Sequence, residues 1–170
     1  MDPNLHFCEG NNIQPAFMPQ NLAAGANTGA WVSLKEYYRC AVVFIGAAGA
    51  AGQPPTVTLQ QSQDISGSSP KALNFTDIRV KKGTSLAAAG KFTTVAQAAA
   101  DTFTETYGNG RAIWVIDISA EDLDISNGYH AIQASVADVG STPQYGCCMY
   151  VLHAPREAGI DGTLPDPTVN

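Results

Sequence analysis

The sequence predicts an all-β fold in which short antiparallel strands form a two-layered β-sandwich. Between residues 31 and 154, short segments alternate apolar and polar side chains, as strands with one buried and one solvated face do. Gly, Pro, Asn and Ser interrupt these segments about every ten residues. Hydrophobic residues make up 45 % of the 170 residues, which is enough for one core. We expect an eight-stranded jelly roll, although an immunoglobulin-like strand order fits the same pattern.

The chain divides into three parts: an extended N-terminal arm (1–30), the β-sandwich (31–154) and a C-terminal tail (155–170). The arm is rich in Pro and Asn, and its apolar residues follow neither a helical nor a strand period. A merely disordered arm would have little use for apolar anchors, so we expect it to lie along a neighbouring protein surface, with plain disorder as the alternative. The partner-binding candidates are Phe7, Ile13, Phe17, Met18 and Leu22. The tail, with two prolines, has a similar composition.

Eight strands are expected in the sandwich, at residues 39–46, 56–61, 72–82, 92–95, 102–106, 111–119, 130–139 and 145–154. The first is apolar on both faces, which predicts a strand covered on both sides. In the third, the apolar phase slips once around Thr76 and Asp77, which predicts a β-bulge that returns both halves to the core.

The connections between these strands also have recognisable signals. The Ala-rich residues 96–100 could support at most about one turn of helix. Residues 107–110 read Tyr-Gly-Asn-Gly, which predicts a turn into a central strand at 111–119. Ser119 and Asp122 are spaced as in a capping box, so a one-turn helix is expected after that strand.

Charge excludes one class of function and favours another. The chain carries a net charge of −6, and only Arg79, Lys81 and Lys82 cluster, so nucleic-acid binding is not expected. A solvated strand end explains these three residues more simply than a binding patch does.

No stretch is long and apolar enough to span a membrane, and no signal segment is visible. Charged residues make up only 14 %, against about 25 % in typical soluble domains, so much of the surface is expected to meet another protein.

The four cysteines are expected to be free thiols in a reducing cytoplasm. Cys147 and Cys148 are neighbours on one strand, so their side chains point to opposite faces. Cys40 lies in another apolar strand and Cys8 in the arm. A cross-strand disulfide from Cys40 to Cys147 or Cys148 is the alternative.

No catalytic, cofactor-binding or metal-binding residue is predicted. His6, His130 and His153 have no nucleophile and carboxylate at motif spacing. Asp122, Asp124 and Ser126 resemble the opening of a calcium loop, but the glycine comes one residue late and no Glu closes the loop, so acids that cap a short helix explain them. Pairs of acids suited to glycosidase chemistry, such as Asp117 with Glu121 or Asp64 with Asp77, carry no specific signal. The Gly-rich residues 46–52 do not have the spacing of a phosphate loop.

A sugar-stacking platform is the main alternative to a protein-binding surface. Its aromatic candidates are Trp31, Tyr37, Tyr38, Trp114, Tyr145 and Tyr150.

Several strand phrases together resemble a known family. They are Trp31–Lys35 leading into an apolar strand, Thr56–Gln61, Ala72–Phe75, Trp114–Ile118 followed by Glu121–Asp124, and Tyr150–Arg156. In these phrases, residues 30–157 are similar to the jelly-roll cement or decoration proteins on the outside of tailed-bacteriophage heads. The long N-terminal arm departs from that resemblance.

The resemblance implies a virion structural protein without enzymatic activity or cofactor. It implies that the protein is made in the host cytoplasm and sits on the outer surface of the capsid, where it cements adjacent major capsid protein subunits. It also implies assembly with itself as a dimer or trimer. The alternatives are a carbohydrate-binding or host-adhesion module of a virion, and another head, neck or tail component.

Overall fold

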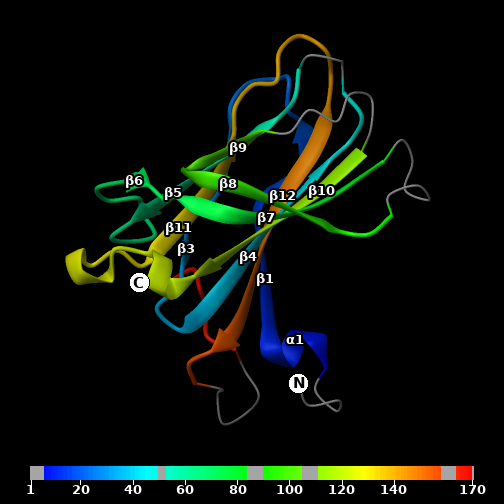
Figure 1. The fold of residues 1–170 in the computed structure, drawn as a ribbon. Coiled ribbons are helices and arrows are strands. Elements are labelled where there is room, and N and C mark those ends of the chain that lie inside the picture. Colours follow the sequence, from blue (N-terminus) through cyan, green and yellow to red (C-terminus); the bar gives the residue numbers. More distant parts are fainter. Residues whose placement is uncertain (1–5, 50–52, 84–89, 105–110, 158–163, 170) are drawn as a thin grey trace.

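The computed structural model describes residues 6–49, 53–83, 90–104, 111–157 and 164–169. Within these residues the chain forms two sheets of antiparallel strands, sheet A and sheet B, which pack face to face (Figure 1). The predicted all-β sandwich is therefore confirmed. The jelly-roll strand order stays a prediction.

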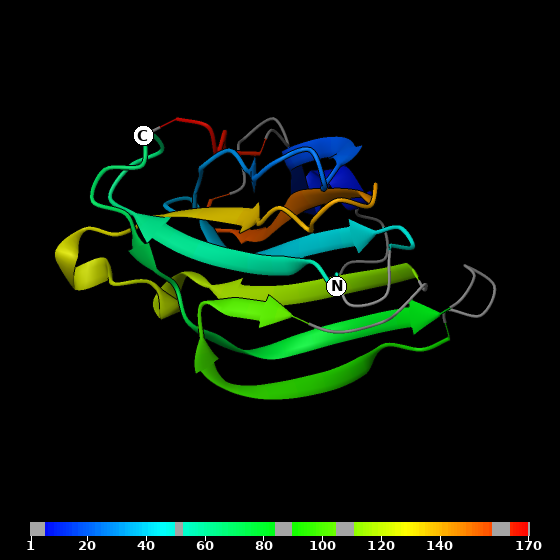
Figure 2. The same ribbon diagram turned by 90° about the horizontal axis from the view of Figure 1, so that it is seen from above.

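Sheet A has six strands, and its two edges lie on opposite sides of the molecule (Figure 2). Its order is β1 (Asn11–Asn21), β12 (Tyr145–Pro155), β4 (Tyr37–Gly46), β10 (Arg111–Ser119), β7 (Phe75–Gly83) and β8 (Thr93–Ala100). β10 lies between β4 and β7, which confirms the prediction that residues 111–119 form a central strand.

Sheet B consists of shorter strands. Its order is β2 (Asn27–Thr28), β11 (Ala131–Val136), β5 (Thr56–Ser62) and β6 (Lys71–Ala72), while β3 (Val32–Ser33) also pairs with β11 and β9 (Thr102–Thr104) with β5. The described helical turns are α1 (Phe7–Gly10), η1 (Ala120–Asp122) and η2 (Ile125–Asn127).

The core lies between the two sheets and is built from the inward side chains of both, with β8 contributing only the partly buried Val95. Along β10, alternate residues from Ala112 to Ile118 are buried, as a period of two requires. Trp114 is fully buried, and its ring centroid lies 4.9 Å from that of Phe44 in sheet A and 5.1 Å from that of Phe103 in sheet B. These aromatic contacts join the two layers at one end of the core.

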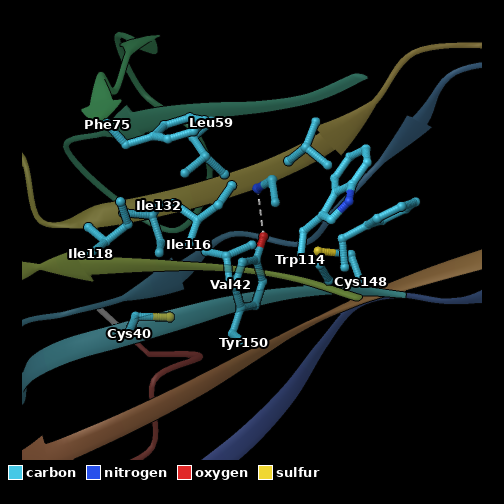
Figure 3. Packing of buried hydrophobic residues seen from close by; sticks show 14 of the residues in the cluster. Cys40, Val42, Leu59, Phe75, Trp114, Ile116, Ile118, Ile132, Cys148 and Tyr150 are labelled. Atoms are coloured by element: carbon cyan, nitrogen blue, oxygen red, sulfur yellow. Dashed lines mark hydrogen bonds between the residues drawn. The ribbon is translucent and has the colours of Figure 1, made fainter. Parts of the chain in front are cut away.

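A tyrosine hydroxyl also joins the two layers. The Tyr150 side chain of β12 is fully buried and points from sheet A toward sheet B (Figure 3). Its hydroxyl accepts a hydrogen bond from the backbone N–H of Ala134 in β11 at 2.7 Å and donates one to the carbonyl of Ala30 at 2.9 Å. Burial raises the pKa of Tyr150 well above its usual value, so the hydroxyl stays protonated and can donate.

The expected extended arm is wrong for residues 11–21, because these residues form β1, an edge strand paired with β12. Phe17 and Leu22, predicted to contact a partner, are instead buried in the protein's own core, at 8 % and 0 % exposure. The reason is geometric: β12 needs a partner on its outer side, and β1 supplies both backbone hydrogen bonds and two core side chains. Phe7, Ile13 and Met18 remain exposed.

The described part of the C-terminal tail also folds onto the sandwich. The backbone N–H of Ser33 donates to the carbonyl of Pro167 at 2.8 Å. The Tyr37 hydroxyl donates to the carbonyl of Pro165 at 2.6 Å, and the Asn12 side-chain amide donates to the same carbonyl at 3.2 Å. These bonds attach residues 164–169 to both β1 and β4.

Two local predictions from the sequence agree with the structure. The ladder between β7 and β8 has an irregularity between Phe75 and Asp77, where the bulge was predicted, and the apolar side chains on either side of it are buried. The Ser119 hydroxyl accepts a hydrogen bond from the N–H of Glu121, and Asp122 accepts one from the N–H of Ser119, which confirms the predicted cap.

The Ala-rich residues do not form the expected connection between two strands. Residues 96–100 are part of strand β8, because pairing with β7 outweighs the helix propensity of alanine. The expected strand at 72–82 is also divided, since β6 belongs to sheet B and β7 to sheet A. The turn predicted at 107–110 and the last two residues of the strand predicted at 102–106 lie outside the described residues.

Candidate binding surface

The face of sheet A that points away from sheet B is apolar over its three central strands. We call this surface the apolar face, and it consists of outward side chains of β4, β10 and β12. They are Ala41, Val43, Ile45, Ile113, Val115, Cys147, Met149 and Val151. Most are half-buried by one another, and Ile45 is 37 % exposed. An exposed side of a sheet is ordinarily polar, so a patch of this kind indicates a surface that is covered in the working state.

The strand register makes this patch continuous. Met149, Val43 and Val115 are direct neighbours across the three strands. The next row on one side contains Cys147, Ile45 and Ile113 in the same order. Adjacent strands are about 4.8 Å apart, so such rows leave no room for a polar side chain between them.

One end of the apolar face carries charges of both signs, and there Arg79 lies 3.8 Å from Asp77. The Arg39 guanidinium donates two hydrogen bonds to the carboxylate of Asp117, at 3.2 and 2.8 Å. Asp117 raises the pKa of Arg39, so the guanidinium stays charged. A hollow of about 570 Å³ lies here, and its lining includes these two residues, Asp77, Arg79 and Asp122.

The opposite end carries cationic side chains. A smaller hollow of about 270 Å³ lies there, lined mainly by apolar atoms of residues such as Pro19, Ile45, Ile113 and Tyr145. Lys81 and Arg111 also line it. The apolar face therefore lies between an end with paired charges of both signs and an end with cationic side chains, separated along the strand direction.

A second exposed apolar region follows the edge of sheet A. We call Phe7, Ile13 and Met18 the edge anchors; their side chains are 57 %, 47 % and 67 % exposed. Phe7 belongs to α1, which lies at the end of β1 in Figure 1, and the other two belong to β1 itself. Three of the five partner-binding candidates are thus exposed, while Phe17 and Leu22 are not available to a partner.

The acidic residues considered for metal binding make structural contacts instead. The Asp124 carboxylate accepts hydrogen bonds from Lys71, Ser126 and Asn127, and the Lys71 ammonium holds the pKa of Asp124 well below its usual range. Of the acids that resembled a calcium loop, Asp124 therefore stabilises the turn around η2, and Asp122 caps η1. In the part of the chain that the structure describes, no group of three His, Cys, Asp or Glu residues is placed to hold a metal ion.

The histidines and the paired acids do not form one constellation. His6 lies at the start of α1, a ring nitrogen of His130 lies 3.0 Å from the carbonyl of Gly128, and His153 lies 3.7 Å from Asp117. Asp64 accepts hydrogen bonds from the N–H groups of Ser66 and Ser68 in its own loop. These bonds fix a surface turn and leave Asp64 apart from Asp77, its suggested partner, which lies on β7 of sheet A.

The cysteines and aromatics are divided between core and surface. Cys40 and Cys148 are buried free thiols, Cys147 is half-buried and Cys8 is exposed. Of the aromatics considered for sugar stacking, Tyr37, Trp114 and Tyr150 are fully buried in the core. Tyr38 packs against the Arg156 guanidinium at 4.5 Å, and Tyr145 is 61 % exposed beside the smaller hollow. The buried three cannot contact a ligand, so no platform of six aromatics exists.

Comparisons with known proteins identify no relative. No protein-family model matches the chain, and a search of curated proteins returns no match. Among the described helices, none has the length and apolar character needed to cross a membrane.

Proposed function

We propose that the protein is a non-enzymatic structural protein that acts by covering and joining other protein surfaces. The apolar face carries this proposal. Removing side chains such as Val43 and Met149 from water lowers the free energy by about 25 cal/mol per Å² of apolar surface. Large contiguous apolar patches on a soluble protein indicate an interaction site.

A protein that joins others needs at least two separate contact regions. The apolar face supplies one, which Ile13 of β1 extends beside Val151, and Phe7 of α1 supplies another beyond the end of β1. Two weak contacts on one rigid body reinforce each other, because the first contact raises the effective concentration for the second. This arrangement suits a role as cement.

The most specific form of the proposal is a capsid decoration protein of a tailed bacteriophage. The resemblance of the strand phrases at 30–157 supports it, together with the two-layered β fold, the low fraction of charged residues and the two apolar contact regions. The protein would be made in the host cytoplasm, bind the outer surface of the head and bridge adjacent major capsid protein subunits. It would bind neither nucleic acid nor membrane, and it would stabilise the shell by mass action alone.

Co-sedimentation with empty tailed-phage heads that lack a decoration protein tests this proposal. Wild-type protein is expected to sediment with the heads, and the double variant Phe7→Ser/Met18→Ser to lose at least tenfold in affinity. The variant Ile125→Ser removes an equally exposed apolar side chain, on η2, and serves as the matched control that binds normally. Wild-type protein that stays in the supernatant at all concentrations would refute the decoration role.

A carbohydrate-binding role is the second candidate, because Tyr145 is exposed beside a hollow. The lining of that hollow is almost entirely apolar, whereas sugar hydroxyls need several hydrogen-bonding partners. A glycan array with wild type and with Tyr145→Ala and Trp31→Ala separates the two roles. Saturable binding lost in the variants would favour the carbohydrate role over cement.

A further inference from the structure

We infer that the smaller hollow, at the cationic end of the apolar face, receives an aromatic side chain of a partner protein, and that a carboxylate of the same partner segment lies beside Lys81. The inference rests on the proposed function, because it names the chemistry that the covered surface recognises in its partner. The partner segment is one in which an aromatic residue and an acidic residue are close neighbours.

The hollow forms because a small residue lies between two larger ones at the end of the sheet. Ala47 follows the last residue of β4, and its N–H donates to the carbonyl of Tyr145 in β12 at 2.7 Å. On the other side of β4, Ala112 of β10 is paired with Gly46, which places Arg111 next to Ala47. The side chains of Tyr145 and Arg111 therefore line the hollow on either side of a methyl group.

The walls of the hollow offer a guest few hydrogen-bonding partners. Ile45, Ile113 and Cys147 form one row across β4, β10 and β12 and line it from the side of the apolar face. Water in such a place makes few hydrogen bonds, so replacing it by an apolar group is favourable. The volume of about 270 Å³ equals roughly nine water molecules at about 30 Å³ each, which is close to the size of one aromatic side chain.

An exposed ring in the wall favours an aromatic guest over an aliphatic one. The Tyr145 side chain lines the hollow and is 61 % exposed. Two aromatic rings in contact, with centres about 4.5–7 Å apart, attract each other beyond the effect of their buried area. Aromatic side chains that fill a pocket from which water is excluded often dominate the binding energy of an interface. An inserted ring would remove itself and Tyr145 from water in one contact.

The charge around the hollow selects an acidic partner segment. Lys81 of β7 is paired with Ile113, and its ammonium lies 5.5 Å from the centre of the Phe92 ring. It makes no ion pair with any residue that the structure describes. Among the described residues that line the hollow, Lys81 and Arg111 are cationic and none is acidic, although the whole chain has a net charge of −6. A partner carboxylate is therefore attracted to this place, while most of the protein repels it.

The opposite end of the apolar face is a less favourable place for that carboxylate. There, the Arg39 guanidinium lies 2.8 Å from Asp117, and the Arg79 guanidinium lies 3.8 Å from Asp77. Each of these cations already has a carboxylate of its own chain beside it. A further carboxylate would meet a pair of little net charge, so the cationic end determines where the partner segment is anchored.

Binding of 3-phenylpropanoate to the full chain tests this inference, because the probe joins one aromatic ring to one carboxylate. The matched probes 3-phenylpropanol and 3-phenylpropylamine keep the ring and carry a neutral or a cationic head group. Amide NMR spectra measure both the affinity and the place of binding, through the signals of Ala47, Ala112 and Gly146 around the hollow. We expect a dissociation constant of about 1 mM for the carboxylate and an affinity at least fivefold lower for the amine.

Variants of the lining show whether the probe occupies the hollow. Ala47→Leu fills it and should lower the affinity at least tenfold, whereas Ala41→Leu makes the same change beside the larger hollow and should have no effect. Tyr145→Ser removes the exposed ring of the wall and should also weaken binding, in a folded protein with the circular dichroism spectrum of the wild type. Lys81→Met keeps the length of the side chain and should reduce the preference for the carboxylate over the amine at least twofold. The matched change Lys91→Met, at an exposed residue outside the hollow, should leave that preference unchanged.

Several results would overturn the inference. They are equal affinity for the carboxylate and the amine, NMR shifts that lie away from the hollow, and unchanged binding by both Ala47→Leu and Tyr145→Ser. A carboxylic acid released in equimolar amount from the purified protein would assign the hollow to a free ligand instead, and a wild-type dimer that Ala47→Leu dissociates would assign it to a second copy. A protein that binds the probe as expected but ignores phage heads would keep the inference and refute only the decoration role. A protein that coats heads without preferring the carboxylate would do the reverse.

Discussion

The hydroxyl of Tyr150 offers the sharpest test of how the two layers are held together. Replacing Tyr150 with Phe removes one oxygen atom and keeps the ring, so packing in the core is conserved. The change deletes the hydrogen bonds to Ala134 and Ala30, at 2.7 and 2.9 Å. The question is how much stability these two bonds provide.

The magnitude follows from where the two partners lie. Ala134 is fully buried, so its N–H has no water to replace the lost acceptor, and an unsatisfied buried donor costs about 1–3 kcal/mol. Ala30 is exposed, so water can hydrate its carbonyl and the cost there is small. We therefore expect Tyr150→Phe to lower the free energy of unfolding by about 1–3 kcal/mol.

Urea denaturation followed by tryptophan fluorescence measures this change, because Trp114 lies in the same core. For a chain of this length, the same loss corresponds to a fall in the melting temperature of about 2–4 °C per kcal/mol. The matched control is Tyr145→Phe, which removes a hydroxyl from a side chain that is 61 % exposed and should change stability by less than about 0.5 kcal/mol. If Tyr150→Phe behaves like this control, the bonds between the layers contribute nothing and the reasoning is wrong.

Two further predictions concern titratable groups. Burial raises the pKa of the Cys148 thiol to about 12, so in the folded protein a maleimide should label the exposed Cys8 within minutes and Cys148 only after unfolding; rapid labelling of Cys148 in native buffer would contradict its placement in the core. The pKa of Asp124 is lowered mainly by Lys71, so this carboxylate stabilises the fold at neutral pH and loses that effect as the pH falls through its folded pKa, below the ordinary value of 3.8. Asp124→Asn should therefore melt earlier than wild type at pH 6 and approach it near pH 2, and an equal difference at both pH values would argue against the ion pair.

The strands with regular alternation could be predicted from sequence alone. In β10, Trp114 and Ile116 alternate with Val115 and Asp117, and only one choice of inward face buries the tryptophan. The capping box at Ser119 and the bulge near Asp77 are likewise local signals, because both depend on residues within a few positions of one another. Such features do not require knowledge of the rest of the chain.

The edge strand β1 could not be predicted in this way. Two register shifts, between Pro15 and Phe17 and between Phe17 and Gln20, reset its alternation, so Ile13 and Pro15 face outward while Phe17 faces inward. Without a constant period and with two prolines, the segment has the composition of an arm. Only its pairing with β12, about 130 residues away in sequence, makes it a strand.

Recognising the apolar face also required the strand order of sheet A, which the sequence alone does not provide. The outward residues of β10 were visible in the sequence, and β4 was recognised as apolar on both faces, which led us to expect a cover on each side. The sequence does not say that β12, β4 and β10 are neighbours, so it could not show that their outward side chains form one patch. The expected second cover on β4 is absent from the described residues, where Ile45 remains 37 % exposed.

The irregular edges of sheet A have a consequence for how assemblies of this protein end. On β1, Pro15 and Pro19 lack the N–H that a strand added from another chain would need, and the ladder on β8 loses its regularity after Ala96. Growth by edge-to-edge pairing, which propagates without limit and leads to fibres, is therefore opposed on both sides. Association through the apolar face, as proposed above, adds no strand to either edge and so does not extend the sheet.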